Sequence, residues 1–280
     1  MKRKDGFVSI VKGFITGIAS LIPGVSPASC FVSLSSYEKF ITGLSTIFSK
    51  KTNKKEKINN KQILLLVTIP IILGLLLGLV AGNHLISYFL GKYKVQTVFL
   101  FIGILVGGLV LIFKKKQITP TKKTILVFII SLILFFALYI FLNNYNITIP
   151  KFLYPILAGF LTSLTVIVPC ISASYIYNIL DKYNYIINSL SSLSNIKNIL
   201  IVIVFIATLV LTLILIAKLI SYLIKKHKEK CYSIISALII LNIIIMILKI
   251  DKFTISFVNI FTTILAFLWG YLLAKNIEKE

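Results

Sequence analysis

Arginine, acidic residues and cysteine are scarce in this chain, and each scarcity excludes a kind of site. Arg3 is the single arginine among 280 residues, so no arginine-rich motif for phosphate is present. Asp and Glu together number eight, and no His/Asp or Ser/His/Asp arrangement or metal-binding cluster can be recognised. The three cysteines show neither Cys-x-x-Cys nor Cys/His spacing. We therefore expect no enzyme, no cofactor, no metal site and no disulfide framework.

Hydrophobic residues, by contrast, make up 58% of the chain, and the mean hydropathy is +0.99. Charged side chains, at 14%, are too few to cover so much apolar surface in water. The composition therefore predicts an integral membrane protein. The formal net charge of +22 would also suit a nucleic-acid partner, but the basic residues concentrate in short connections between apolar runs, where they set orientation in a membrane. We expect no nucleic-acid partner.

Six uncharged apolar runs are long enough to cross a hydrocarbon core of about 30 Å as helices. They lie at residues 63–81, 96–113, 124–142, 199–217, 231–248 and 254–274. Each set of three follows a segment interrupted by proline, at residues 7–48 and 152–190. The predicted fold is an all-α integral membrane protein, in which each half has a re-entrant hairpin followed by three transmembrane helices.

The two halves repeat one another without a gap. The segment GFITGIASLIPGVS at residues 13–26 returns as GFLTSLTVIVPCIS at residues 159–172, and Tyr37 returns as Tyr183. Every pair is 146 residues apart, which indicates a tandem duplication with repeats at residues 1–146 and 147–280. In membrane transporters, paired breaks of this kind mark a binding site at the repeat interface.

The distribution of basic residues predicts on which side of the membrane each connection lies. The N-terminal segment, the connections at 50–61, 114–123 and 218–230 and the C-terminal tail contain 22 lysines and arginines, whereas the opposite connections contain seven. By the positive-inside rule the first set is cytoplasmic, and so are both termini. Each hairpin returns to its own side, and three crossings then turn the second half upside down. We therefore expect an inverted-topology repeat.

The residue types at each break suit a binding site. Pro23 ends the first limb because it lacks an amide proton, and Gly24 permits a sharp reversal. Ser26 before Pro27 is a helix-start signature in which the serine hydroxyl caps free amides, and Ser172 repeats it. Two such helix starts that face each other would suit an anion, particularly a phosphate.

Helix lengths place the first break near the middle of the membrane. Lys12 precedes Pro23 by roughly 16 Å of helix, and Glu38 follows Ser26 by roughly 18 Å. If both charges lie at the cytoplasmic surface, the break reaches about half the hydrocarbon thickness. We expect Ser26 and Ser172 to point into a common polar cavity there.

The predicted substrate-binding residues come from both breaks and the limbs beside them. They are Thr16, Pro23, Gly24, Val25, Ser26, Ser29, Tyr37, Thr162, Pro169, Cys170, Ile171, Ser172, Ser174 and Tyr183. The threonine hydroxyls could equally bond within their own helices, and the tyrosines could be interface anchors. Glu38 and Asp181, the acids near the breaks, are candidates to couple transport to a proton or a sodium ion. An interfacial pair of Glu38 with Lys39 is the alternative.

The two breaks resemble one family. Residues 13–26 followed by Tyr37 and Glu38, and Val-Pro-Cys-Ile-Ser at 168–172 followed by Tyr183, are similar to the bacterial PopT-type polyprenyl-phosphate transporters, a family long known as a domain of unknown function. The resemblance implies a flippase of the cytoplasmic membrane whose partner is a polyprenyl-phosphate lipid. It would return undecaprenyl phosphate, the lipid carrier of cell-wall sugars, from the outer to the inner leaflet. The chain departs from the family pattern at Pro27, Cys170 and Ala173, where glycine is usual.

Two other functions would use some of the same features. A transporter or channel for a small soluble anion would use the same helix starts but would need an enclosed aqueous route. A lateral opening to lipid between the repeats would separate a lipid transporter from it. An intramembrane enzyme such as a lipid phosphatase is disfavoured, because no catalytic constellation can be recognised.

Overall fold

The structure is a computed structural model that describes residues 3–47, 54–116, 121–144, 150, 152–172, 183–192, 194–250 and 256–279. Across these residues all regular secondary structure is helical, and no strand occurs. The predicted all-α class is therefore confirmed.

The first half of the chain places two short helices between longer ones. Helix α1 (Arg3–Ala19) leads to α2 (Pro27–Ser33) and α3 (Tyr37–Ser45). Helix α4 (Lys54–Ile63) continues through the π-helical turn η1 (Leu64–Thr68) into α5 (Ile69–Lys92). Helices α6 (Lys94–Lys116) and α7 (Lys122–Asn144) complete this half.

The described part of the second half follows the same order of short and long helices. Helix α8 (Tyr154–Ile167) precedes the second break, and α10 (Tyr183–Ser191) follows it. The long helices are α11 (Ile196–Lys226), α12 (Lys228–Leu248) and α13 (Phe257–Lys279).

Six helices among the described residues are long and apolar enough to cross a membrane. They are Ile58–Lys92, Lys94–Lys114, Lys122–Phe141, Ile196–Lys226, Lys228–Leu248 and Phe257–Ile277. Each overlaps one of the six expected apolar runs, so that expectation is confirmed and the chain is a multi-pass membrane protein. The first and fourth extend beyond their runs, to Lys92 and Lys226. A polar residue ends an apolar run without ending a helix, because backbone hydrogen bonding continues and long lysine side chains can reach water.

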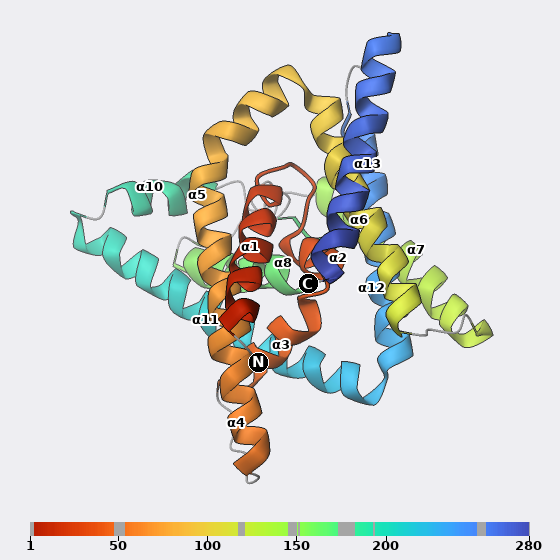
Figure 1. Cartoon of the computed structure of the whole chain (residues 1–280). Coiled ribbons are helices and arrows are strands. Elements are labelled where there is room, and N and C mark those ends of the chain that lie inside the picture. The colour runs from red at the N-terminus through yellow and green to blue at the C-terminus, as the bar shows by residue number, and fades with distance from the viewer. Residues whose placement is uncertain are drawn as a thin grey trace.

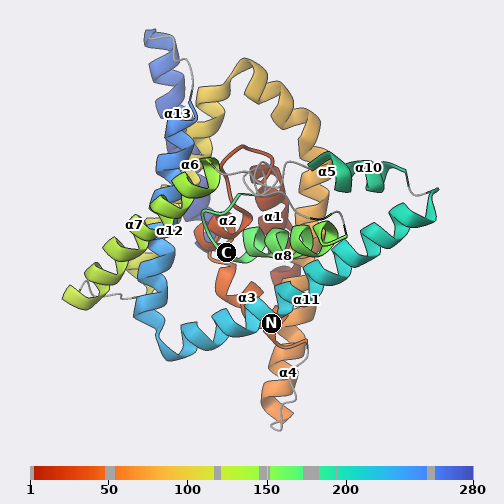
Figure 2. The same ribbon diagram turned by 180° about the vertical axis from the view of Figure 1, so that it is seen from behind.

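Short helices lie at the centre of the molecule and long ones around them. Figure 1 shows α1, α2 and α8 in the middle, and Figure 2 shows the same arrangement from behind. The helices pack in pairs: α1 lies along α5 and α8 along α11, while α6 lies along α13 and α7 along α12. Helix α2 contacts both α6 and α8, so the helix after the first break lies against elements of both halves.

Glycines allow α1 to approach α5 closely. A β-carbon on Gly13 would strike the backbone carbonyl of Ile71, and one on Gly74 would strike the carbonyl of Ile10. Small residues at such positions let helix backbones touch within a membrane. The first limb of the broken segment is thereby held along a membrane-spanning helix.

Candidate functional site

The breaks in the two halves touch each other. The Ser26 hydroxyl lies 3.3 Å from the carbonyl oxygens of both Thr165 and Val168 and donates a shared hydrogen bond to them. The Cys170 amide donates to the hydroxyl oxygen of Ser29 at 3.3 Å. These bonds join residues 139 to 142 positions apart. The fold therefore brings together the two segments that the duplication singled out.

The breaks also share a backbone conformation at their turning points. Gly24 has a φ of +94° and Cys170 has a φ of +75°, and the two positions correspond through the 146-residue offset. Glycine takes this left-handed conformation freely, whereas a residue with a β-carbon is strained there. The reversal expected at Gly24 is present, and Cys170 makes the same turn without a glycine.

The cap expected at Ser26 is wrong. Ser26 does occupy the N-cap position of α2, with φ −99° and ψ 134°, and Pro27 follows in the first turn, but the serine side chain makes no capping hydrogen bond. Its hydroxyl bonds the end of α8 instead. The last carbonyls of a helix have no partner within that helix, so they take the donor that α2 brings to them.

Tyr37 makes a third link between the halves. Its side chain is 4% exposed, and its hydroxyl donates a 2.8 Å hydrogen bond to the carbonyl of Ile167, the last residue of α8. An interface anchor would hold its hydroxyl at the water surface, so that alternative is wrong for Tyr37. Like Ser26, Tyr37 satisfies the carbonyl end of α8.

Ser26 and Ser172 are both buried. Their side chains are 0% and 3% exposed, and neither lines the cavity or the groove described below. The predicted residues Ser174 and Asp181 lie outside the described residues. Tyr183 is the first residue of α10, and its side chain also lies outside the described part.

The two threonines bond within their own helices. Thr16 Oγ1 donates to the Lys12 carbonyl at 2.8 Å, and Thr162 Oγ1 donates to the Ala158 carbonyl at 2.6 Å. Of the two alternatives for these residues, the structure shows the intrahelical bond.

Helix α12 holds the first break through a buried amide. The Asn242 side chain, 0% exposed, donates to the Gly24 carbonyl. Near the same point, the Cδ atom of Lys249 lies 3.9 Å from the place that a β-carbon on Gly24 would take. Burial lowers the pKa of Lys249. The first break therefore lies toward the C-terminal end of α12 rather than beside its middle.

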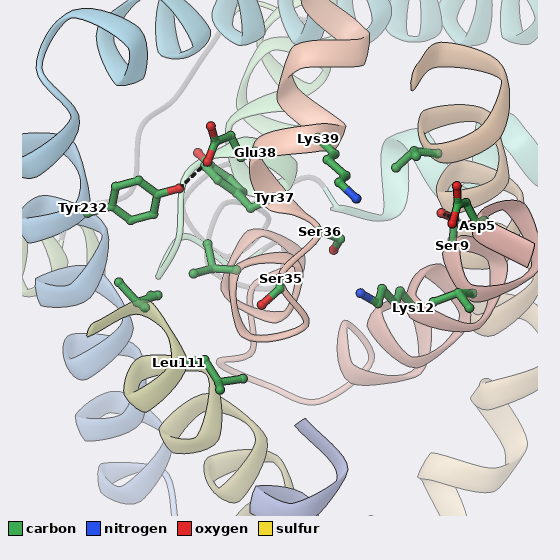
Figure 3. Close-up of a pocket in the computed structure, with 14 residues that line it drawn as sticks. Asp5, Ser9, Lys12, Ser35, Ser36, Tyr37, Glu38, Lys39, Leu111 and Tyr232 are labelled. Carbon is green, nitrogen blue, oxygen red and sulfur yellow. Dashed lines mark hydrogen bonds between the residues drawn. The ribbon is translucent and has the colours of Figure 1, made fainter. Parts of the chain in front are cut away.

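A cavity of about 350 Å³ is bordered by both limbs of the first broken segment. It is lined by Asp5, Val8, Ser9, Lys12, Val32, Ser35, Ser36, Tyr37, Glu38, Lys39, Val67, Leu111, Ile112 and Tyr232. Figure 3 shows the ammonium groups of Lys12 and Lys39 pointing into the same space beside Ser36. Asp5 and Glu38 add two acidic groups to the walls. Two limbs of one broken segment thus bring charges of both signs to a single cavity.

Lys12 lies beside a helix that is long and apolar enough to cross a membrane. Lys12 neighbours Gly13, whose backbone lies against Ile71 of that helix. The position of the first break near the middle of the membrane stays a prediction.

The start of α3 supplies further polar groups to the cavity. Residues 35–39 line it, and Ser36, the N-cap residue of α3, makes no side-chain capping bond. A helix start carries a partial positive charge of about +0.5 and suits an anion. Tyr232 donates a 2.8 Å hydrogen bond to Glu38 Oε2 across the cavity wall (Figure 3). Glu38 therefore has a partner from α12.

Comparison with known proteins assigns the family. The sequence matches the VCA0040-like family, described as undecaprenyl phosphate translocase-like, over residues 16–248. The chain belongs to this translocase-like family. It is also 29% identical over 101 residues to the polyprenyl-phosphate transporter of Staphylococcus aureus (strain NCTC 8325 / PS 47), an alignment that covers 36% of this chain and 32% of that protein. The matched part is thus about a third of that relative's length. No solved structure matches the chain.

In this translocase-like chain, sequence reasoning missed two polar residues of α12. Asn242 and Tyr232 both lie in a run that reads as a plain apolar span, yet they contact the first break and the cavity. The available signal was the lone asparagine within an isoleucine-rich helix, because polar groups inside a membrane are costly and commonly functional.

Proposed function

We propose that this protein carries a polyprenyl phosphate, with undecaprenyl phosphate as the leading candidate, from the outer to the inner leaflet of the bacterial cytoplasmic membrane. Returning the lipid would recycle the carrier of cell-wall sugars. The family description and the name of the staphylococcal relative support this substrate class. The observation that carries the proposal is the pair of lysines, Lys12 and Lys39, that point into one cavity.

The cavity suits a phosphate headgroup for three reasons. The lysine ammonium groups offer charge-assisted hydrogen bonds, the start of α3 adds a favourable dipole, and Ser35 offers a hydroxyl. An unaided phosphate charge in hydrocarbon costs on the order of tens of kcal/mol in the Born limit. A polar cavity would replace part of the hydration that the headgroup loses.

The wider architecture in this proposal is an inverted repeat, with residues 1–146 and 147–280 as the two units and a re-entrant hairpin in each. The left-handed turns at Gly24 and Cys170 support the correspondence. The crossed pairing of α6 with α13 and of α7 with α12, each joining a helix of one unit to a helix of the other, also supports it. Alternating access between such units exposes one site to each leaflet in turn.

The basic connections support an orientation with both termini in the cytoplasm. The cavity lies beside the start of α1, the end of α6 and the start of α12, which are the ends that adjoin those connections. In this orientation the cavity faces the cytoplasm. The bonds of Ser26, Ser29 and Tyr37 to the second break close the far side.

Glu38 gives the proposal a route to proton coupling. Its carboxylate lines the cavity that would hold the phosphate, and two negative groups in one cavity repel each other. A proton on Glu38 would relieve that repulsion, so lipid phosphate and proton would travel together. Asp181 remains the second candidate for coupling.

The test is leaflet exchange in reconstituted vesicles. Purified protein in vesicles with undecaprenyl phosphate in the outer leaflet should clear that leaflet faster than protein-free vesicles do. Uptake of inorganic phosphate by the same vesicles tests the alternative function. Phosphate uptake without lipid movement would replace the proposal by a soluble-anion transporter.

A further inference from the structure

A second hollow adjoins the phosphate cavity and has a different character. It measures about 230 Å³ and is lined by Phe113, Thr124, Ile125, Phe128, Tyr232, Ser233 and Ser236. These residues come from the end of α6, the start of α7 and the first half of α12. Phe113 and Ile125 are 48% and 47% exposed, so the groove opens on the outer surface of the helices, where lipid would lie. We call it the α7–α12 groove.

Tyr232 is the wall between the cavity and the groove. It lines both of them, while its hydroxyl donates to Glu38 Oε2 at 2.8 Å on the cavity side. Neighbouring residues of α6 also lie on the two sides of this wall. Leu111 and Ile112 line the cavity, whereas Phe113 lines the groove. A charged chamber and an apolar passage to the outside thus share one aromatic partition.

Ser236 gives the groove one buried polar group. Its side chain is 1% exposed, and its hydroxyl has no hydrogen-bond partner within the described residues. A buried hydroxyl without a partner is unfavourable unless a ligand supplies one. A lipid phosphate brings acceptor oxygens where its headgroup joins its chain, so a ligand lying along the groove with its headgroup at Tyr232 brings that acceptor to this wall.

We propose that the α7–α12 groove is the lateral exit through which the isoprenoid chain of the lipid reaches the bilayer while its phosphate occupies the cavity. This inference rests on the proposed function and adds the path of the tail. A phosphate cannot enter hydrocarbon cheaply, and a long isoprenoid chain cannot enter water cheaply. One molecule can satisfy both demands only where the polar chamber adjoins the lipid, and Tyr232 borders both the cavity and the groove.

In this proposal the groove admits the isoprenoid chain because it provides room for it, and not because it binds the chain tightly. A chain that leaves lipid for an apolar groove exchanges one hydrocarbon environment for another, so little hydrophobic energy is gained. Filling the groove should therefore exclude long chains and leave short ones unaffected. This distinguishes an exit for the tail from a wall that merely supports the cavity.

The test compares the binding of two ligands to the wild type and three variants, in protein reconstituted into lipid nanodiscs. Ser236→Trp fills the groove, Ser236→Ala removes the same hydroxyl but keeps the groove open, and Ile244→Trp places a tryptophan at a partly exposed site on α12 outside the groove. The ligands are undecaprenyl phosphate and isopentenyl phosphate, which has a single isoprene unit. Ser236→Trp should bind undecaprenyl phosphate at least about tenfold more weakly than Ser236→Ala does, while these two variants bind isopentenyl phosphate equally. Ile244→Trp should bind both ligands as the wild type does.

The outcomes separate the two proposals. If wild-type protein binds neither phosphate, the proposed function fails, and the exit fails with it. If wild-type protein binds both and Ser236→Trp binds each ligand as well as Ser236→Ala does, or binds both more weakly by the same factor, the exit alone is overturned.

A second measurement needs no substitution. A photoreactive group on the first isoprene unit of a polyprenyl phosphate should cross-link the wild-type protein to the segments around Phe113, Ile125 and Ser236. Cross-links confined to α5 or α13 would contradict the exit at α7–α12.

Discussion

The Tyr37 hydroxyl donates a 2.8 Å hydrogen bond to the Ile167 carbonyl, 130 positions further along the chain. The bond joins the first turn of α3, which lines the cavity, to the end of α8 at the second break. In the proposed alternating access, a movement that opens the far side of the cavity would separate these two atoms. Removal of the Tyr37 hydroxyl oxygen is therefore expected to weaken the contact between the breaks.

Tyr37→Phe should loosen the contact between the breaks. The Ile167 carbonyl would remain buried without this donor, a loss of about 1–3 kcal/mol. In protein with Cys30 and Cys231 replaced by alanine, Cys170 should then react faster with a thiol reagent than in the same background with Tyr37. Tyr88→Phe, at an exposed tyrosine of α5, is the control and should leave the rate unchanged. Equal rates in all three proteins would show that the Tyr37 bond does not hold the breaks together.

Gly24 and Cys170 should respond to substitution in opposite directions. Gly24→Ala places a β-carbon in a left-handed conformation and should destabilise the fold by about 1–2 kcal/mol. The added atom meets only ordinary contacts of 3.5 Å or more, so the effect is conformational. Cys170→Gly removes the same strain and should stabilise by about 0.5–1 kcal/mol, the gain being reduced by the extra freedom of glycine when unfolded. Thermal unfolding in detergent measures both, and a fall in midpoint for Cys170→Gly would contradict the account of the turn.

Glu38→Gln tests proton coupling. Glutamine keeps the size of the side chain but cannot exchange a proton, so lipid transport should lose its dependence on an imposed pH gradient. Glu229→Gln, at a glutamate in the first turn of α12 outside the cavity, should keep it. If Glu38→Gln protein still responds to the gradient as the wild type does, another group carries the coupling ion.

Thiol labelling tests the orientation. Single cysteines at Thr121 and His227, in a background without the native cysteines, should be shielded from impermeant reagents added to intact cells. A cysteine at Asn195 should react. Each site is exposed in the structure, so accessibility within the protein is not the limit. Labelling of Thr121→Cys from outside would overturn the assigned sidedness.

The six long helices could be predicted because their apolar runs match a bilayer in length, and the paired breaks because proline and its neighbours repeat at one offset. The partner of Ser26 could not be predicted. Its hydroxyl turns to carbonyls 139 and 142 positions away, and no local pattern shows that the end of α8 lacks donors.

The cavity was also beyond sequence reasoning. Tyr232 of α12 contributes to its wall because its hydroxyl reaches Glu38 at the start of α3, which helical periodicity alone does not reveal. The cavity therefore formed no part of the expected site, although Tyr37 and Glu38, two of its lining residues, did.

The most direct test of the central claim compares wild-type protein with the double variant Lys12→Gln/Lys39→Gln in vesicles that carry undecaprenyl phosphate in the outer leaflet. Lys225→Gln, an exposed lysine near the end of α11 outside the cavity, is the matched control. Each cavity lysine offers a hydrogen bond between charged groups, for which about 1.5–3 kcal/mol is typical, so the double variant should clear the leaflet at least about a hundredfold more slowly. The control should match the wild type. If the double variant clears the leaflet as fast as the wild type, the cavity does not hold the phosphate and the account is wrong.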